Sequence, residues 1–118
     1  MMGPSAAWHR AMRFDDLWIG EAVGLELGGV PVLLLNIEDE VRAYVDSCPH
    51  QGSRLSEGEL DGRELTCARH QWEFDALSGE GINPADARLE LLPVRVEGGM
   101  IEVMVEAGLP RLRWNVRA

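Results

Sequence analysis

Four residues of this chain have the types and the spacing of metal ligands. They form two short motifs, C-x-H and C-x-x-H, with sixteen residues between them. The four residues are Cys48, His50, Cys67 and His70. The chain contains 2 cysteines and 3 histidines, so the motifs use both cysteines and all but one histidine. Because thiolates and neutral imidazoles are both good ligands for metals, this concentration predicts a metal centre.

Two kinds of centre fit this ligand set. A pair of irons bridged by two sulfides needs four terminal ligands, and here two thiolates can bind one iron while two imidazoles bind the other. A structural zinc ion takes two cysteines and two histidines in a closed tetrahedron. The C-x-H spacing favours ligands that are spread over two irons. We therefore expect one [2Fe–2S] cluster, with a structural zinc or redox-sensing module as the remote alternative.

Length and composition restrict the rest of the interpretation. With 118 residues, we expect one domain over residues 1–118 with one modest core. No phosphate-binding glycine motif and no second metal motif is present, so we expect an electron-transfer component rather than an enzyme. No apolar run approaches the ~20 residues of a membrane span, and the start lacks a signal-peptide pattern. We expect a cytoplasmic protein with no membrane partner.

The charge is acidic and unevenly placed. The net charge is −9, and residues 14–106 contain all 20 carboxylates against six arginines, a local balance of −14. An acidic body argues against nucleic acid, which requires a positive surface. The surplus either steers the protein toward a basic protein surface or simply keeps it soluble.

The pattern of apolar residues predicts an all-β fold. Residues 32–37 and 41–45 are typical of two strands joined by a turn. Residues 93–97 and 100–105 alternate and flank Gly98-Gly99, which predicts a hairpin. Shorter strands are expected at 22–27, 64–66 and 71–74, a helical turn at 15–18, and loosely attached ends over the first 12 and last eight residues.

With these motifs, the chain resembles the bacterial Rieske-type ferredoxins over about residues 14–108. Segments 16–21 (DLWIGE), 55–58 (LSEG), 72–75 (WEFD) and 81–84 (GINP) most resemble the ferredoxin component of toluene-type and alkene-type multicomponent diiron monooxygenases. The resemblance implies the Rieske iron–sulfur fold: an antiparallel β-sandwich with a small cluster-binding subdomain at about residues 46–75.

The resemblance also implies a rim around the cluster that meets partner proteins. The expected rim residues are Pro49, Gln51, Gln71, Trp72, Asn83 and Pro84. Respiratory Rieske proteins carry two further cysteines, and a serine and a tyrosine that hydrogen-bond to sulfur atoms at the cluster. Here the chain has no further cysteine, and Trp72 and Phe74 stand at the latter two positions. The chain therefore resembles the low-potential class.

The expected function is that of a one-electron carrier, acting as a monomer. An NADH-dependent reductase with flavin or iron–sulfur groups would reduce it, and the hydroxylase component of a diiron monooxygenase for aromatic or alkene oxidation would accept the electron. A Rieske aromatic-ring-hydroxylating dioxygenase is the alternative oxygenase partner. The sequence of such a carrier does not identify the hydrocarbon, because the carrier does not bind it.

Overall fold

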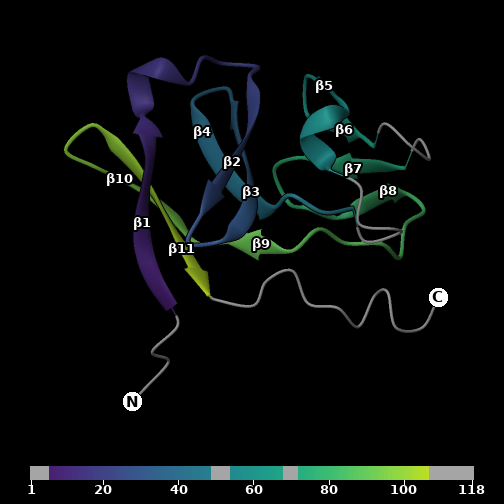
Figure 1. Ribbon diagram of the computed structural model, residues 1–118. Coiled ribbons are helices and arrows are strands. Elements are labelled where there is room, and N and C mark those ends of the chain that lie inside the picture. The colour runs from purple at the N-terminus through teal and green to yellow at the C-terminus, as the bar shows by residue number, and fades with distance from the viewer. Residues whose placement is uncertain (1–5, 49–53, 68–71, 107–118) are drawn as a thin grey trace.

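The computed structural model describes residues 6–48, 54–67 and 72–106, and strands make up most of them (Figure 1). The only helical elements in these ranges are two 3-10 turns, η1 (Phe14–Asp16) and η2 (Leu55–Glu57). All strand pairs are antiparallel. The expected all-β fold is confirmed. No helix of the described part is long and apolar enough to cross a membrane.

The strands form three sheets that lie side by side. The outer sheet has the order β1-β11-β10, the central sheet β2-β3-β4-β9, and the small sheet β5-β6-β7-β8. The outer-sheet strands are β1 (Ala6–Arg13), β10 (Val94–Glu97) and β11 (Met100–Glu106). The central-sheet strands are β2 (Ala22–Leu27), β3 (Val30–Ile37), β4 (Glu40–Val45) and β9 (Leu91–Leu92). The small-sheet strands are β5 (Glu59–Asp61), β6 (Glu64–Thr66), β7 (Glu73–Asp75) and β8 (Gly81–Asn83).

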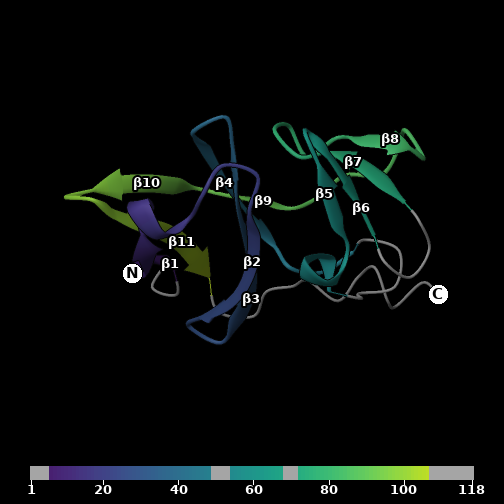
Figure 2. The ribbon, with the colours of Figure 1, turned by 90° about the horizontal axis from the view of Figure 1, so that it is seen from above.

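The central sheet is buried on both faces. Along β3, Val32 and Leu34 belong to a core shared with the outer sheet, whereas Leu33 and Leu35 belong to a second core shared with the small sheet. Successive side chains of a strand point to opposite faces, so one strand supplies both cores. This double burial explains why β3 is an almost continuous apolar run. Seen from above, the central sheet stands between the other two (Figure 2).

The hairpins confirm the turn chemistry expected from the sequence. Gly98 and Gly99 have φ angles of +57° and +81°, the left-handed region that a two-residue hairpin turn requires. In β11, Ile101, Val103 and Val105 are buried in alternation, as predicted. Between β3 and β4, Glu38 and Asp39 also have positive φ, and the Asn36 Oδ1 atom accepts the Asp39 N–H at 2.8 Å.

Four local expectations differ from the structure. Residues 6–12 are not loosely attached: β1 pairs with β11 from Ala6↔Glu106 to Arg13↔Met100. The helical turn expected at 15–18 lies at Phe14–Asp16, and Trp18 beyond it is 71% exposed. The expected strand at 71–74 is found as Glu73–Asp75, with Gln71 outside the described residues. The small sheet runs on to Asn83, past the expected subdomain limit near residue 75.

Candidate metal centre

The first motif begins where β4 leaves the central sheet. The Val45 N–H donates to the Glu90 carbonyl and the Asp46 N–H donates to the Pro31 carbonyl, both at 2.9 Å. These bonds fix the end of the strand just before Cys48. The cysteine itself is 1% exposed. Its backbone is therefore held by the central sheet while its side chain is removed from water.

The second motif begins at the end of β6. The Cys67 N–H donates to the Trp72 carbonyl at 2.7 Å, directly beyond the Thr66↔Glu73 pair of β6 and β7. This bond joins the two residues that flank residues 68–71. Cys67 is 0% exposed. Like Cys48, it is a buried cysteine shortly beyond the end of a strand.

The two cysteines lie in the same core. Both belong to the second core, together with Leu55, Leu65 and Phe74. Two buried cysteines from different motifs, within one apolar cluster, fit a metal centre that takes a thiolate from each motif. The other two sequence-predicted ligands, His50 and His70, lie outside the described residues. The sulfur half of the donor set is therefore compatible with a two-iron cluster.

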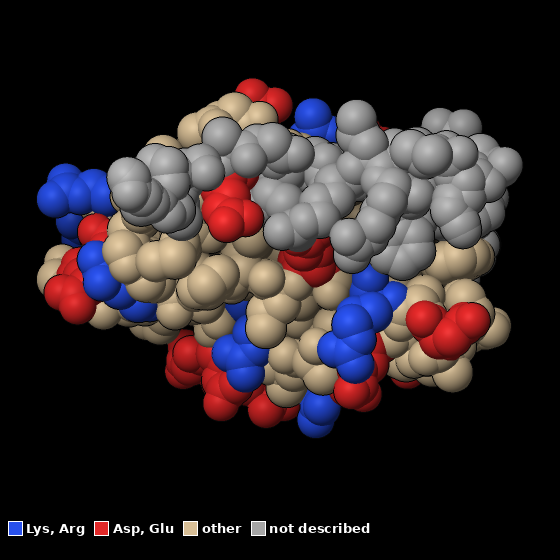
Figure 3. Space-filling view, turned by 90° about the horizontal axis from the view of Figure 1, so that it is seen from below, with Lys and Arg blue, Asp and Glu red and all other residues tan. Residues whose placement is uncertain are grey.

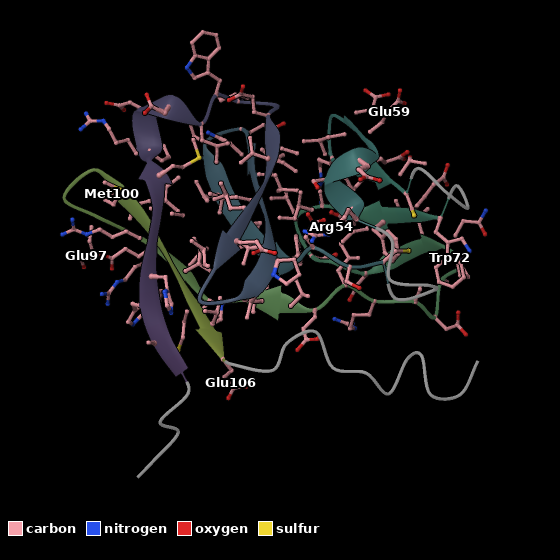
Figure 4. All side chains as sticks on the ribbon, in the orientation of Figure 1. Arg54, Glu59, Trp72, Glu97, Met100 and Glu106 are labelled. Atoms are coloured by element: carbon pink, nitrogen blue, oxygen red, sulfur yellow. The ribbon has the colours of Figure 1, made fainter. Side chains whose placement is uncertain are left out.

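Part of the predicted rim is described. Trp72 is half-buried, and its ring lies 6.5 Å from the Phe74 ring between centroids. Asn83 is exposed and pairs with Glu73, the residue next to Trp72, so β8 lies beside the strand that leaves the second motif. The Asn83-Pro84 peptide bond is cis. Figure 4 shows Trp72 at the end of the molecule opposite the β10–β11 hairpin. Pro49, Gln51 and Gln71 lie outside the described residues.

Polar side chains next to the centre were not predicted from the sequence. The buried Tyr44 hydroxyl donates to the Ala76 carbonyl at 2.6 Å, and Arg42 Nε donates to the Leu77 carbonyl at 3.0 Å. These bonds tie β4 to the turn after β7. Burial, partly offset by the positive charge of Arg42, raises the pKa of Tyr44 to about 12. The alternation of polar residues along β4 was the available signal.

The carboxylate of Asp46 continues this alternation. It is fully buried and accepts two hydrogen bonds from Ser56. Arg54, whose side chain is 45% exposed, lies beside it with Nη1 3.8 Å from Oδ2. Figure 4 shows Arg54 where the central and small sheets meet. Nothing in the ligand motifs themselves points to this group.

Comparison with known proteins agrees with this geometry. The Rieske [2Fe-2S] domain family matches residues 7–93. The chain is 44% identical over 94 residues to the "alkene monooxygenase system, ferredoxin component" of Xanthobacter autotrophicus, covering 78% of this chain and 76% of that protein. It is 32% identical over 100 residues to the "naphthalene 1,2-dioxygenase/salicylate 5-hydroxylase systems, ferredoxin component" of a Ralstonia species, covering 84% and 96%.

A solved structure has the same fold. It is described as the "complex of reduced oxygenase and oxidized ferredoxin in carbazole 1,9a-dioxygenase". The match has a TM-score of 0.76 at 28% identity and covers 84% of this chain and 94% of the other.

The strand order, the paired buried cysteines and the family match define an iron–sulfur protein of the all-β kind. The chain belongs to the Rieske [2Fe-2S] domain family. Its cofactor is one Rieske-type [2Fe–2S] cluster.

Proposed function

We propose that this protein is the ferredoxin of a multicomponent diiron monooxygenase and passes single electrons to its hydroxylase. The observation that carries the proposal is the 44% identity to an alkene monooxygenase ferredoxin component over 94 residues. Segments 16–21 and 81–84, which resemble the ferredoxins of diiron monooxygenases, favour the same assignment. As a carrier, the protein needs no substrate pocket.

The cluster is proposed to be held by Cys48 and Cys67 on one iron and by His50 and His70 on the other. When bound, the cluster supplies reversible one-electron chemistry at a reduction potential above that of all-cysteine ferredoxins. The burial of both cysteines supports their role as ligands, because it keeps water from the sulfur atoms. The described residues around them are apolar, with Leu55, Leu65 and Phe74 in the same core.

The proposed docking surface is the rim of the cluster. It comprises Pro49, Gln51, Gln71, Trp72, Asn83 and Pro84. The half-buried Trp72 and the exposed Asn83 support this, since Asn83 pairs with Glu73, the residue next to Trp72, and Trp72 lies at one end of the molecule (Figure 4). A small, largely polar contact suits a carrier that must leave quickly after each electron. The proposed electron donor is an NADH-dependent reductase with flavin or iron–sulfur groups, and the proposed state is a cytoplasmic monomer.

Metal analysis tests the cofactor assignment. Protein purified under conditions that allow cluster assembly should contain two irons and two acid-labile sulfides per chain. Cys48→Ser should lose the cluster and destabilise the fold, because metal ligation contributes to folding free energy. Stoichiometric zinc without iron in the wild-type protein would refute the assignment and support the structural-zinc alternative.

Reconstitution tests the partner. Mixed with an NADH reductase and an alkene- or toluene-type diiron hydroxylase, the protein should support epoxidation or hydroxylation that depends on its concentration. The alternative partner is a Rieske ring-hydroxylating dioxygenase, which the 32% identity to a naphthalene dioxygenase ferredoxin component favours. Formation of a cis-dihydrodiol with such a dioxygenase, together with no activity with diiron hydroxylases, would decide for that alternative.

A further inference from the structure

A buried carboxylate joins the two ends of the chain segment that contains the first ligand motif. The side chain of Asp46 is 0% exposed. Its Oδ1 atom accepts the Ser56 N–H at 2.8 Å, and its Oδ2 atom accepts the Ser56 hydroxyl at 2.6 Å. Asp46 lies two residues before Cys48, and Ser56 lies after the motif in η2. These two bonds therefore close the chain around the motif.

The surroundings of this carboxylate leave little freedom for movement. A β-carbon added to Gly24 of β2 would lie 2.7 Å from the Ser56 hydroxyl oxygen and 3.0 Å from Asp46 Oδ2. The backbone of β2 therefore covers the pair at a distance that only glycine allows. Leu55, next to Ser56, is 0% exposed and lies in the same core as Cys48. Both ends of the segment are thus fixed to packed parts of the molecule.

The energetics indicate a specific role for the charge. Burying a carboxylate is costly unless hydrogen bonds and counter-charges compensate it. Here both oxygens accept hydrogen bonds, and Arg54 adds a guanidinium at 3.8 Å. Hydrogen bonds to an ionised acceptor are about twice as strong as neutral ones. An apolar pair of similar size would fill the space, but it would not fix the direction in which the chain enters the motif.

We propose that Asp46 is a positioning residue: with Ser56 it forms a lock between the two ends of the segment that contains Cys48, and this lock sets how tightly the cluster is retained. This inference rests on the proposed role of Cys48 as a cluster ligand. A loosened lock lets Cys48 move away from its bonding position more often, so that chelators and water reach the iron.

The test compares three substitutions in the lock with a matched control. Ser56→Ala removes the hydroxyl bond, and Gly24→Ala displaces the hydroxyl from β2, both without changing charge. Asp46→Asn removes the charge while keeping the shape. The control is Asn36→Ala on β3, since Asn36 is 2% exposed and makes two hydrogen bonds, to Leu17 and Asp39, away from the lock. For each purified holoprotein, bleaching of the cluster by excess chelator and thermal unfolding are measured, together with the reduction potential and electron paramagnetic resonance spectrum.

Ser56→Ala and Gly24→Ala should release the cluster about tenfold faster than wild type and broaden the resonance of the reduced cluster. Asn36→Ala should unfold at a lower temperature but release the cluster at nearly the wild-type rate. The double variant of Asp46→Asn and Ser56→Ala should be no worse than the worse single variant, because both break the same lock.

The inference would be overturned if the rate of cluster release depended only on thermal stability. Asn36→Ala would then release the cluster as fast as Ser56→Ala. Additive effects in the double variant would also overturn it. Failure of the proposed function has a different signature: a wrong partner assignment leaves the cluster and the lock effects unchanged, and a wrong cofactor assignment leaves the wild-type protein without a two-iron cluster. A Cys48→Ser protein that retains a normal cluster would likewise reject the ligand role, whatever the lock variants do.

Discussion

At the scale of single residues, alternate side chains of β4 contact different parts of the molecule. Val41, Ala43 and Val45 belong to the core between the central and outer sheets. The residues between and after them make the polar contacts to the small sheet and its turns, namely Arg42, Tyr44 and Asp46. Because successive side chains of a strand face opposite ways, one strand both stabilises the base and places the metal-binding part.

The first prediction concerns the ionisation of Tyr44. The raised pKa of about 12 means that the folded protein favours the neutral phenol. Its contribution to stability is therefore complete below the unfolded pKa of 10.0 and is lost as the pH rises from 10 to about 12. Tyr44 is the only tyrosine of the chain, so the ultraviolet difference spectrum on alkaline titration reports it alone. The midpoint should lie near 12, and a midpoint near 10 in the folded protein would contradict the buried hydrogen bond.

Tyr44→Phe tests the same contact from the stability side. Removing the hydroxyl leaves the Ala76 carbonyl without this donor, at a cost of about 1–3 kcal/mol in the free energy of unfolding. Denaturant unfolding at neutral pH should show this loss. The difference from wild type should shrink above pH 10, since the wild-type protein then begins to lose the same contribution. A constant difference up to pH 12 would show that the hydroxyl does not titrate as expected.

The contribution of Asp75 to stability has the opposite pH dependence to that of Tyr44. Partial burial raises its pKa, but the Leu77 N–H, the Arg63 guanidinium and the Ser78 N–H outweigh this and lower the pKa below 3.8. Its stabilising contribution is therefore present above pH 3.8 and is lost as the pH falls through the lowered folded-state pKa. Between pH 5 and pH 3, the thermal midpoint of wild type should fall more than that of Asp75→Asn. Parallel curves for the two proteins would show that this carboxylate does not contribute.

At the scale of secondary-structure elements, the sequence predicted what depends on neighbours in the chain. The β10–β11 hairpin could be predicted because the alternating apolar residues and the Gly-Gly turn lie within a short stretch of sequence. Strand β1 was not, because its pairing with β11 joins residues that lie far apart in sequence. Its contacts include Arg95, whose guanidinium carbon lies 4.1 Å from the centre of the Trp8 ring. Such a contact has no local sequence signal.

The same distinction applies to the candidate site. The ligand motifs were predicted because the chemistry of a metal centre restricts residue type and spacing. The lock formed by Asp46 and Ser56 was not predicted, because it exists only when η2 packs against β2 and the end of β4. An aspartate near a loop and a serine ten residues later are common in any sequence. Only the fold distinguishes this pair from two surface residues.

Truncation tests the role assigned to β1. Deleting residues 1–12 should remove most of β1, leave β11 as an edge strand, and open the first core where Ala11 and Met12 pack against it. Burial of one aliphatic side chain contributes about 1.5–3 kcal/mol, so the thermal midpoint should drop by many degrees. Deletion of residues 1–5 is the control and should have little effect. If the longer deletion left the midpoint unchanged, β1 would be dispensable for the fold.

At the scale of the whole molecule, the arginines of the acidic body are engaged in ion pairs. In the described part of residues 14–106, every arginine lies within 4.0 Å of a carboxylate; they are Arg42, Arg54, Arg63, Arg88 and Arg95. On the face seen from below, blue and red groups lie next to each other, with tan residues between them (Figure 3). Because these arginines are paired with nearby carboxylates, the net charge of −9 produces a diffuse negative field around the protein. Such a field acts on the rate of encounter with a partner more than on the strength of the complex.

The last prediction follows from this field and decides between steering and simple solubility. Raising the ionic strength from ~0.01 M to ~0.15 M shortens the screening length from about 30 Å to about 8 Å. The second-order rate of reduction by the reductase should therefore fall several-fold. Glu59→Gln on the small sheet should slow the low-salt reaction more than Glu97→Gln, which makes the same charge change at the opposite end (Figure 4). Stopped-flow kinetics of each variant at both salt concentrations provides the measurement. If the reduction rate did not change with salt, or if the two substitutions had equal effects, the surplus of carboxylates would serve solubility and would not direct docking.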